Sequence, residues 1–222
     1  MTLFLGRQQC INYHSTAKLG AEIDLKGLKL GDRLGDCSTV VGNITDNNGQ
    51  EYIVAVLDAK YRGKAFWGGV IEEDTLLPNY SIRSEVLKAQ NIESSTFNTD
   101  TILNNYNPDD YPAFKLARNA GVVTVNGKVY ESQLPNINTL AMIQQNKEFL
   151  DTCDPTLSDY TENSLTLWKM GALNPWCHSS NEYNLYNTWH LDGTGWYNTI
   201  GKYFIQTTST IEGVIPIFEI PL

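Results

Sequence analysis

The sequence predicts an α+β fold made of short strands and two main helices. Two Asn-Gly pairs, at residues 48–49 and 126–127, separate short runs of β-branched and aromatic residues, as the turns of β-hairpins do. Two further segments, 109–121 and 136–149, carry apolar residues at the spacing of one helix face. Hairpins and amphipathic helices in one chain, without an internal repeat, indicate a shared α+β core.

Two β-hairpins follow from the Asn-Gly turns. The first joins residues 40–45 to residues 52–57, and the second of these strands is a continuous apolar run that predicts burial on both faces. The second hairpin lies in the sequence VVTVNGKVY, with strands at 122–125 and 128–130. Asn-Gly at its centre predicts a type I′ turn.

Two helices have recognisable starts. The first is opened by residues 109–112, where two aspartates precede a proline, and it is stopped by Gly121. The second begins near Asn136 or Asn138 and fades around Phe149. Each has an apolar stripe that should face the core.

The remaining segments are less regular. Residues 72–107 are rich in Asn and predict a long insertion, with a short helix at 83–89. Residues 151–170 predict a loop with at most a helical turn at 164–170. The segment GVIPIFEIPL predicts a terminal strand at a sheet edge, because its prolines cannot donate hydrogen bonds to a neighbour.

The domain division expected from these patterns has two parts. Residues 1–45, with alternating apolar and charged positions and several glycines, predict a small β-rich attachment or oligomerisation segment. Residues 46–222 form the main domain, with its insertion near 72–107.

Charge and composition exclude several classes of function. The net charge is −9 and the basic residues are scattered, which argues against a nucleic-acid groove or an anionic lipid surface. The sequence holds neither a twenty-residue apolar run nor a signal-peptide pattern, so we expect no membrane insertion.

Four cysteines lie far apart in the sequence without a CxxC pair. This spacing argues against a zinc site and against a thioredoxin-type motif. Free buried thiols are expected, and a disulfide between Cys153 and Cys177 is left open as an alternative.

The window from Trp176 to Tyr203 has an unusual composition. It holds three of the five tryptophans and two of the three histidines, interspersed with Tyr, Asn, Ser, Thr and Gly. Rigid aromatic rings among short polar side chains are typical of recognition surfaces. The alternative is that part of these rings is buried scaffold, because Trp and Tyr are also core residues.

The order of patterns in the second half resembles a known family. YPAFKLARNAG, a hairpin, QLPNINTLAMI, WCHSSNEY and GVIPIFEI follow one another over about residues 105–222. This order resembles the C-type lectin-like domains of phage and bacterial receptor-binding proteins, including those diversified by retroelements. The matching residues are Leu134, Pro135, Leu140, Trp176, Ser179, Ser180, Glu182, Val214 and Pro216.

In that family the segment before the last strand displays the residues that contact ligand. The resemblance therefore implies a ligand-binding set, with Cys177 as one more variable position: His178, Asn181, Tyr183, Asn184, Tyr186, Asn187, His190, Asp192, Thr194, Trp196, Tyr197, Asn198 and Tyr203. It implies a scaffold role for Trp176, Glu182, Trp189 and Lys202. Both active diversification and fixed specificity fit this composition.

The resemblance further implies a non-enzymatic protein at the tip of a phage tail fibre. Its expected partners are a host cell-surface glycan or protein and other virion tail proteins, and we expect a homotrimer. A bacterial surface or secreted adhesin and a structural virion protein are the alternatives.

Metal and catalytic roles are not expected, and no cofactor is implied. The calcium motifs of animal lectins are missing, and residues 46–49 and 107–109 are better explained as a hairpin turn and a helix start. Formylglycine-generating enzymes share this fold group, but the Cys177-His178 pair would point its side chains in different directions on an extended chain.

Overall fold

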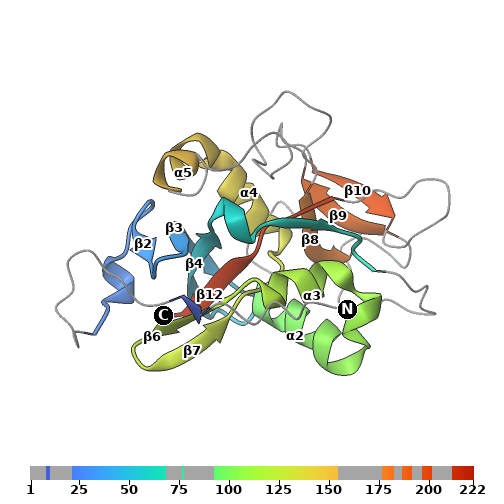
Figure 1. Ribbon diagram of the computed structural model, residues 1–222, viewed down its shortest axis with the longest axis horizontal. Coiled ribbons are helices and arrows are strands. Elements are labelled where there is room, and N and C mark those ends of the chain that lie inside the picture. The colour runs from blue at the N-terminus through green and yellow to red at the C-terminus, as the bar shows by residue number, and fades with distance from the viewer. Residues whose placement is uncertain are drawn as a thin grey trace, which may run out of the picture.

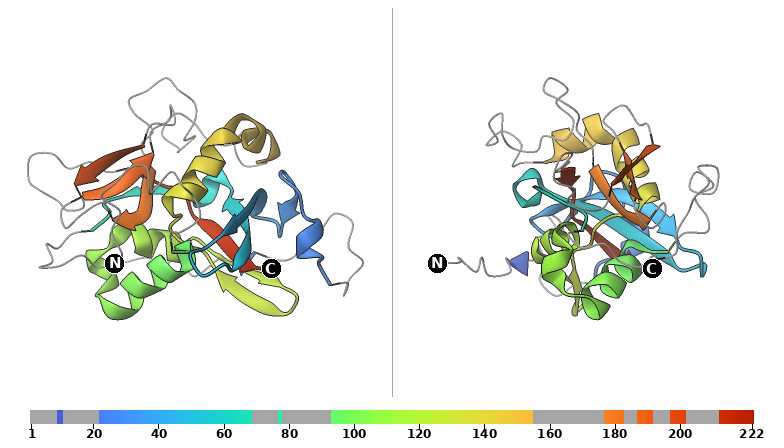
Figure 2. Two further views of the ribbon diagram at one scale, coloured as in Figure 1. Left: turned by 180° about the vertical axis from the view of Figure 1, so that it is seen from behind. Right: turned by 90° about the vertical axis from the view of Figure 1, so that its right-hand side faces the viewer.

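The computed structural model describes residues 9–10, 22–68, 77, 93–154, 177–182, 187–191, 197–201 and 212–222. Within them the chain is a mixed α+β structure of several sheets and helices, which confirms the predicted class (Figure 1). Helices α2 and α3 lie on one side of the sheets, and α4 lies on the other (Figure 2). No helix in these described ranges is long and apolar enough to cross a membrane.

The strands are β1 (Gln9–Cys10), β2 (Arg33–Leu34), β3 (Ser38–Thr45), β4 (Glu51–Leu57), β5 (Gly63–Ala65), β6 (Val122–Val125), β7 (Lys128–Glu131), β8 (Cys177–Glu182), β9 (Asn187–Leu191), β10 (Tyr197–Gly201), β11 (Glu212–Val214) and β12 (Ile217–Pro221). The α-helices are α2 (Ser95–Asn105), α3 (Pro112–Asn119), α4 (Ile137–Gln145) and α5 (Lys147–Cys153). Short 3-10 turns are η1 (Leu25–Gly27), η2 (Ala59–Tyr61) and η3 (Pro108–Asp110).

These strands form three sheets. Their orders are β1-β6-β7, β12-β4-β3-β2 and β10-β9-β8-β11-β5. Most neighbours are antiparallel, but β1 runs parallel to β6 and β11 runs parallel to β8. The third sheet contains the described strands of the aromatic window.

The first predicted hairpin is present as β3 and β4. Val54 and Val56 belong to the core beneath α4, whereas Ile53, Ala55 and Leu57 belong to a second core shared with β6 and β12. Alternating side chains of one strand therefore fill two cores. This confirms that β4 is buried on both faces.

The second predicted hairpin is also confirmed, as β6 and β7. Asn126 and Gly127 have φ values of 50° and 77°, as a type I′ turn requires. The Asn126 side chain also accepts a hydrogen bond from Ile23 N at 2.7 Å and donates one to Ile23 O at 3.0 Å. The turn thus holds the segment before η1 against the hairpin.

The two predicted helices correspond to α3 and α4. Helix α3 buries Ala113, Phe114 and Ala117 against the sheets. Asn136 is the N-cap of α4, and its Oδ1 accepts a hydrogen bond from Thr139 N at 2.8 Å. The start near Asn136 is therefore confirmed, and α5 carries the helical path on to residue 153.

Helix α2 was not predicted and corrects the insertion proposed at residues 72–107. Its inward face buries Ser95, Asn98, Thr99 and Ile102, so residues 95–105 belong to the core. Three of these four side chains are polar, which leaves no apolar stripe to read in the sequence. The predicted helix at 83–89 and the helical turn at 164–170 lie outside the described residues.

The terminal strand is confirmed, with a break at Pro216 between β11 and β12. Strand β12 lies at the edge of the four-stranded sheet. Pro216 has no N–H, but its carbonyl accepts a hydrogen bond from Leu57 N at 3.0 Å. Backbone pairing thus continues through a residue that cannot donate.

The division proposed at residue 45 is not a structural boundary. It falls in the turn of the β3–β4 hairpin, and Leu34 and Val40 are fully buried in the same core as Ile53. Residues 22–45 therefore belong to the main domain. One cysteine differs from the expected free thiols, because Cys37 is disulfide-bonded. Cys153 and Cys177 are not disulfide-bonded, so the alternative pairing of these two is wrong.

Candidate functional site

Strands β8, β9 and β10 form the described part of the aromatic window. β9 pairs antiparallel with both neighbours, and His178 of β8 stands opposite His190 of β9. The register shifts between His178 and Glu182, so β8 contains an irregularity. Irregular positions of this kind re-aim the chain that follows them.

Buried hydrogen bonds fix the irregular part of β8. The Ser179 hydroxyl donates to Trp189 O at 2.8 Å, and the Thr188 hydroxyl donates to Asn181 O at 2.6 Å. From the other side, the Trp67 indole N–H donates to Ser179 O at 2.8 Å. Each of these side chains is buried, so they act as internal ties between strands.

Two helices hold β8 as well. Ser180 N donates to Pro135 O at 2.8 Å, just before α4 begins. Ile137 N, in the first turn of α4, donates to Asn181 Oδ1 at 2.8 Å. From α2, Asn98 Nδ2 donates to Ser180 Oγ at 3.0 Å. The Ser-Ser-Asn sequence of β8 is thus the joint between this sheet and both helices.

Three residues predicted to contact ligand belong to this framework instead. His178 and Asn181 are 1% exposed and His190 is fully buried. His178 Nε2 lies 3.0 Å from Ala65 O, and because a carbonyl can only accept, this nitrogen carries the hydrogen. These three positions are corrected to interior residues, because the surrounding strands and helices bury their side chains.

The other predicted contact residues divide into two groups. Asn187, Tyr197 and Asn198 are strand positions of β9 and β10. The remainder lie outside the described residues: Tyr183, Asn184, Tyr186, Asp192, Thr194, Trp196 and Tyr203. Trp189, a predicted scaffold residue, is 3% exposed and lies in the core beneath α4, and Glu182 ends β8. Trp176 and Lys202 lie outside the description.

The strand register fixes where the chain leaves this sheet. Gly201 pairs with Asn187, and Thr188 pairs with Glu182, so β8 ends, β9 begins and β10 ends at one end of the sheet. At the opposite end, Cys177, Leu191 and Tyr197 are aligned. The connections 183–186 and 192–196 therefore start from opposite ends.

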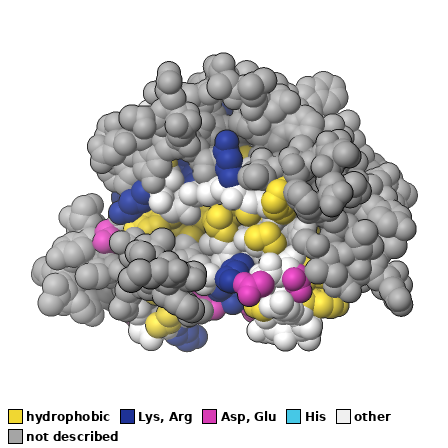
Figure 3. All heavy atoms as spheres, turned by 45° about the vertical axis from the view of Figure 1, so that its right-hand side comes forward, with side chains coloured by type: hydrophobic (Ala, Val, Ile, Leu, Met, Phe, Trp, Pro, Cys, Tyr) yellow, Lys and Arg dark blue, Asp and Glu magenta, His cyan; other side chains and the backbone are white. Residues whose placement is uncertain are grey.

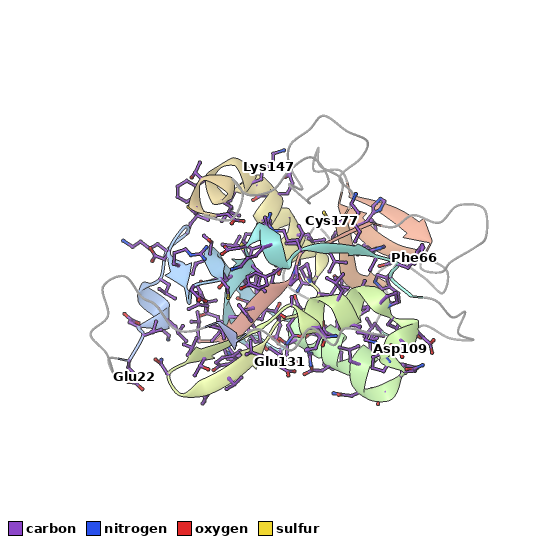
Figure 4. The ribbon with its side chains drawn as sticks, in the orientation of Figure 1. Glu22, Phe66, Asp109, Glu131, Lys147 and Cys177 are labelled. Atoms are coloured by element: carbon purple, nitrogen blue, oxygen red, sulfur yellow. The ribbon has the colours of Figure 1, made fainter. Side chains whose placement is uncertain are left out.

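The side chains of Cys177 and His178 lie in different surroundings. The Cys177 thiol belongs to the core beneath α4 (Figure 4). The imidazole Nε2 of His178 instead lies 3.0 Å from the backbone carbonyl of Ala65 in β5. Adjacent strand residues point to opposite faces, as the sequence predicted. Among the residues that the structure describes, no three His, Cys, Asp or Glu side chains gather as a metal site would require.

A buried ionic network lies elsewhere, around η2. Arg33 donates two hydrogen bonds to the Asp58 carboxylate, at 2.6 and 2.7 Å, and Arg62 donates to Asp154 Oδ2 at 3.3 Å. Asp154 Oδ2 also accepts from Ala59 N at 2.7 Å. Burial raises the pKa of Asp58, and the Arg33 guanidinium opposes this effect. The network joins β2, η2 and the end of α5.

Glu219 is a second buried carboxylate, on β12. It accepts hydrogen bonds from Ser95 N at 2.9 Å, from Thr96 N at 2.8 Å and from the Thr96 hydroxyl at 3.1 Å. Ser94 Oγ accepts from Phe97 N at 3.0 Å. The first N–H groups of α2 are thus satisfied by one distant and one local side chain.

The sequence patterns predicted a role for neither Asp58 nor Glu219, although the sequence contains a signal for Glu219. Glu219 interrupts the apolar run IPIFEIPL, and an ionisable residue on a buried strand requires a partner. Nothing in the sequence near Asp58 indicated that Arg33 would reach it.

One shallow groove of about 430 Å³ lies at the edge of the molecule, lined by Glu22, Ile23, Asp24, Leu25, Lys26, Asn126 and Leu222. Its charges are mixed. On the face drawn in Figure 3, basic and acidic side chains likewise alternate with apolar ones. The described surface in this view therefore favours no strongly charged ligand.

Comparisons with protein-family models, with curated proteins and with solved structures found no match for this chain.

Proposed function

We propose that this chain is a non-enzymatic receptor-binding protein with a C-type lectin-like fold. Its ligand is a cell-surface glycan or protein, contacted by the aromatic and Asn-rich residues that connect and border β8, β9 and β10. The proposed setting is the tip of a phage tail fibre, as a homotrimer that also contacts other tail proteins.

The observation that carries this proposal is that the described polar residues of the aromatic window hold the framework together. Its described small polar side chains, Ser179, Ser180, Asn181 and Thr188, all make hydrogen bonds within the framework. A framework held from inside does not depend on the identity of the residues between its strands. Such an arrangement supports recognition, because connections on a rigid scaffold are where binding residues concentrate.

The buried ionisable groups support binding over catalysis. Asp58 and Asp154 are engaged by arginines, and Glu219 is engaged by the start of α2. A general acid or base must reach a substrate, and these three carboxylates are enclosed. Their hydrogen bonds give each a structural role.

The test is a binding experiment with a fluorescent fusion of the full chain, applied to a glycan array and to a panel of bacterial cells. Replacing Trp196 and Tyr197 together with Ala should abolish binding and leave the melting temperature nearly unchanged, because in this proposal the two rings supply contact area rather than core. Val129→Ala is the matched control, since Val129 is 62% exposed on β7, far from β10.

Three results would count against the proposal. Unchanged binding by the double variant would remove the aromatic surface as the contact. A large fall in melting temperature would mean that the rings are core. Loss of a stable oligomer by the double variant, when the original chain also binds no cell or glycan, would favour the structural virion protein.

A further inference from the structure

The joint between α2, α4 and β8 contains polar atoms without a partner. Asn98 Oδ1, Thr139 Oγ1 and Asn181 Nδ2 are buried and make no hydrogen bond with the rest of the protein. Their residues are 1%, 0% and 1% exposed, respectively. Buried polar side-chain atoms without a partner are uncommon, so three at one joint require an explanation.

Hydrogen bonds tie together the three elements that carry these residues. Asn98 Nδ2 binds Ser180 Oγ, and Ser180 precedes Asn181. Asn181 Oδ1 binds Ile137 N, two residues before Thr139 in the first turn of α4. The unpartnered atoms therefore belong to three elements that are hydrogen-bonded at the same joint.

Reversing the amide groups does not remove the problem. Asn181 must direct Oδ1 at Ile137 N, because two N–H groups cannot bond each other, so its Nδ2 stays unpartnered. Asn98 can turn either amide atom toward Ser180 Oγ, because a hydroxyl both donates and accepts. In either orientation the other amide atom of Asn98 lacks a partner.

The chemistry of these atoms selects the ligand. Asn181 Nδ2 can only donate, Asn98 Oδ1 can only accept, and the Thr139 hydroxyl can do both. A cation would be repelled by the amide hydrogens, and an anion would be repelled by the amide oxygen. A neutral molecule that both donates and accepts, and that is small enough for a packed interior, fits all three.

We propose that this joint is a binding site for one ordered internal water molecule, which accepts from Asn181 Nδ2 and donates to both Asn98 Oδ1 and Thr139 Oγ1. Buried waters commonly make about three hydrogen bonds of this kind. The inference goes beyond the proposed function, because it concerns the framework under β8 and holds whatever the chain binds.

The test uses Thr139→Val, which removes the hydroxyl and keeps the shape of the side chain. Oxygen-17 relaxation dispersion of the full chain should show one long-lived water fewer than the original protein, and the melting temperature should fall. Thr99→Val is the matched control: Thr99 is equally buried, but its Oγ1 already accepts from Leu134 N at 3.1 Å. The control should lose stability and keep the water.

An unchanged dispersion amplitude together with a higher melting temperature would overturn the proposal, because a dry site gains stability when an unpartnered hydroxyl is replaced by a methyl group. If Thr139→Val does not fold, the proposal is tested on the original protein instead. Direct cross-peaks between the Asn181 side-chain amide and water, with the sign of a bound water, are expected in nuclear Overhauser spectra. The absence of these cross-peaks, once the Asn181 amide signals are assigned, would overturn the proposal.

Discussion

Glu219 offers the sharpest test of how the described fold is held together. Replacing it with Ala removes the acceptor of Ser95 N, which is buried, and of Thr96 N, which is partly buried, in the first turn of α2. Each buried donor left unpaired costs about 1–3 kcal/mol, so we expect a loss of roughly 3–5 kcal/mol in the free energy of unfolding. Glu219→Gln keeps one acceptor oxygen and should lose about half as much.

The pH dependence of this effect follows from the pKa of Glu219. Burial raises that pKa, and the hydrogen bonds from Ser95 and Thr96 counteract only part of the rise. Between its ordinary value and the raised value, the folded protein therefore binds more protons than the unfolded chain. The contribution of Glu219 to stability should fall as pH rises through this window, and it should level off above the raised pKa.

Urea denaturation of the original chain and of Glu219→Gln, over a series of pH values from acidic to neutral, measures this directly. Glu51→Gln is the matched control, because Glu51 lies exposed on β4, the strand that pairs with β12. A stability difference between Glu219 and Gln that grows with rising pH would refute the reasoning, since it would mean that the start of α2 stabilises the charged carboxylate more than burial opposes it.

Three further predictions concern the core and the backbone. Gly31→Ala should lower the melting temperature more than Gly49→Ala. Both glycines have positive φ, at 92° and 82°, so the backbone strain is similar. A Cβ at Gly31 would lie 2.6 Å from the Phe149 ring, whereas a Cβ at Gly49 would meet nothing within 4 Å. Asp58→Asn should lower the free energy of unfolding by about 2–4 kcal/mol in urea denaturation, because it breaks the largely buried bidentate pair with Arg33. If the variant is as stable as the original chain, the pair only offsets its own desolvation. Leu140 is fully buried on the inward face of α4, so Leu140→Ala should cost about 2–5 kcal/mol by the same measurement. A loss under about 1 kcal/mol would mean that this core is loosely packed.

The parts of the fold predicted from sequence are those specified by local chemistry. Both hairpins depend on Asn-Gly pairs, whose backbone preference acts over four residues. Helix α4 begins at Asn136, which makes its capping hydrogen bond to a residue three positions later. Such signals lie within one window of sequence.

The parts that were missed depend on distant residues. Helix α2 has a polar inward face, and Glu219 binds its first turn from another sheet. The candidate site shows the same limit. His178, Asn181 and His190 are residue types that recognition surfaces use, and only the tertiary packing around β8 and β9 places them inside.

The separation between Glu219 and α2 has a consequence for biosynthesis. Ser95 and the carboxylate that binds its N–H are 124 residues apart in the chain. A ribosome adds about 5–20 residues each second, so α2 emerges several seconds before its acceptor is made. During that interval its first turn has only Ser94 as a side-chain acceptor among the bonds described. We therefore expect a nascent chain stalled before β12 to remain sensitive to protease at α2, and to acquire resistance once translation resumes.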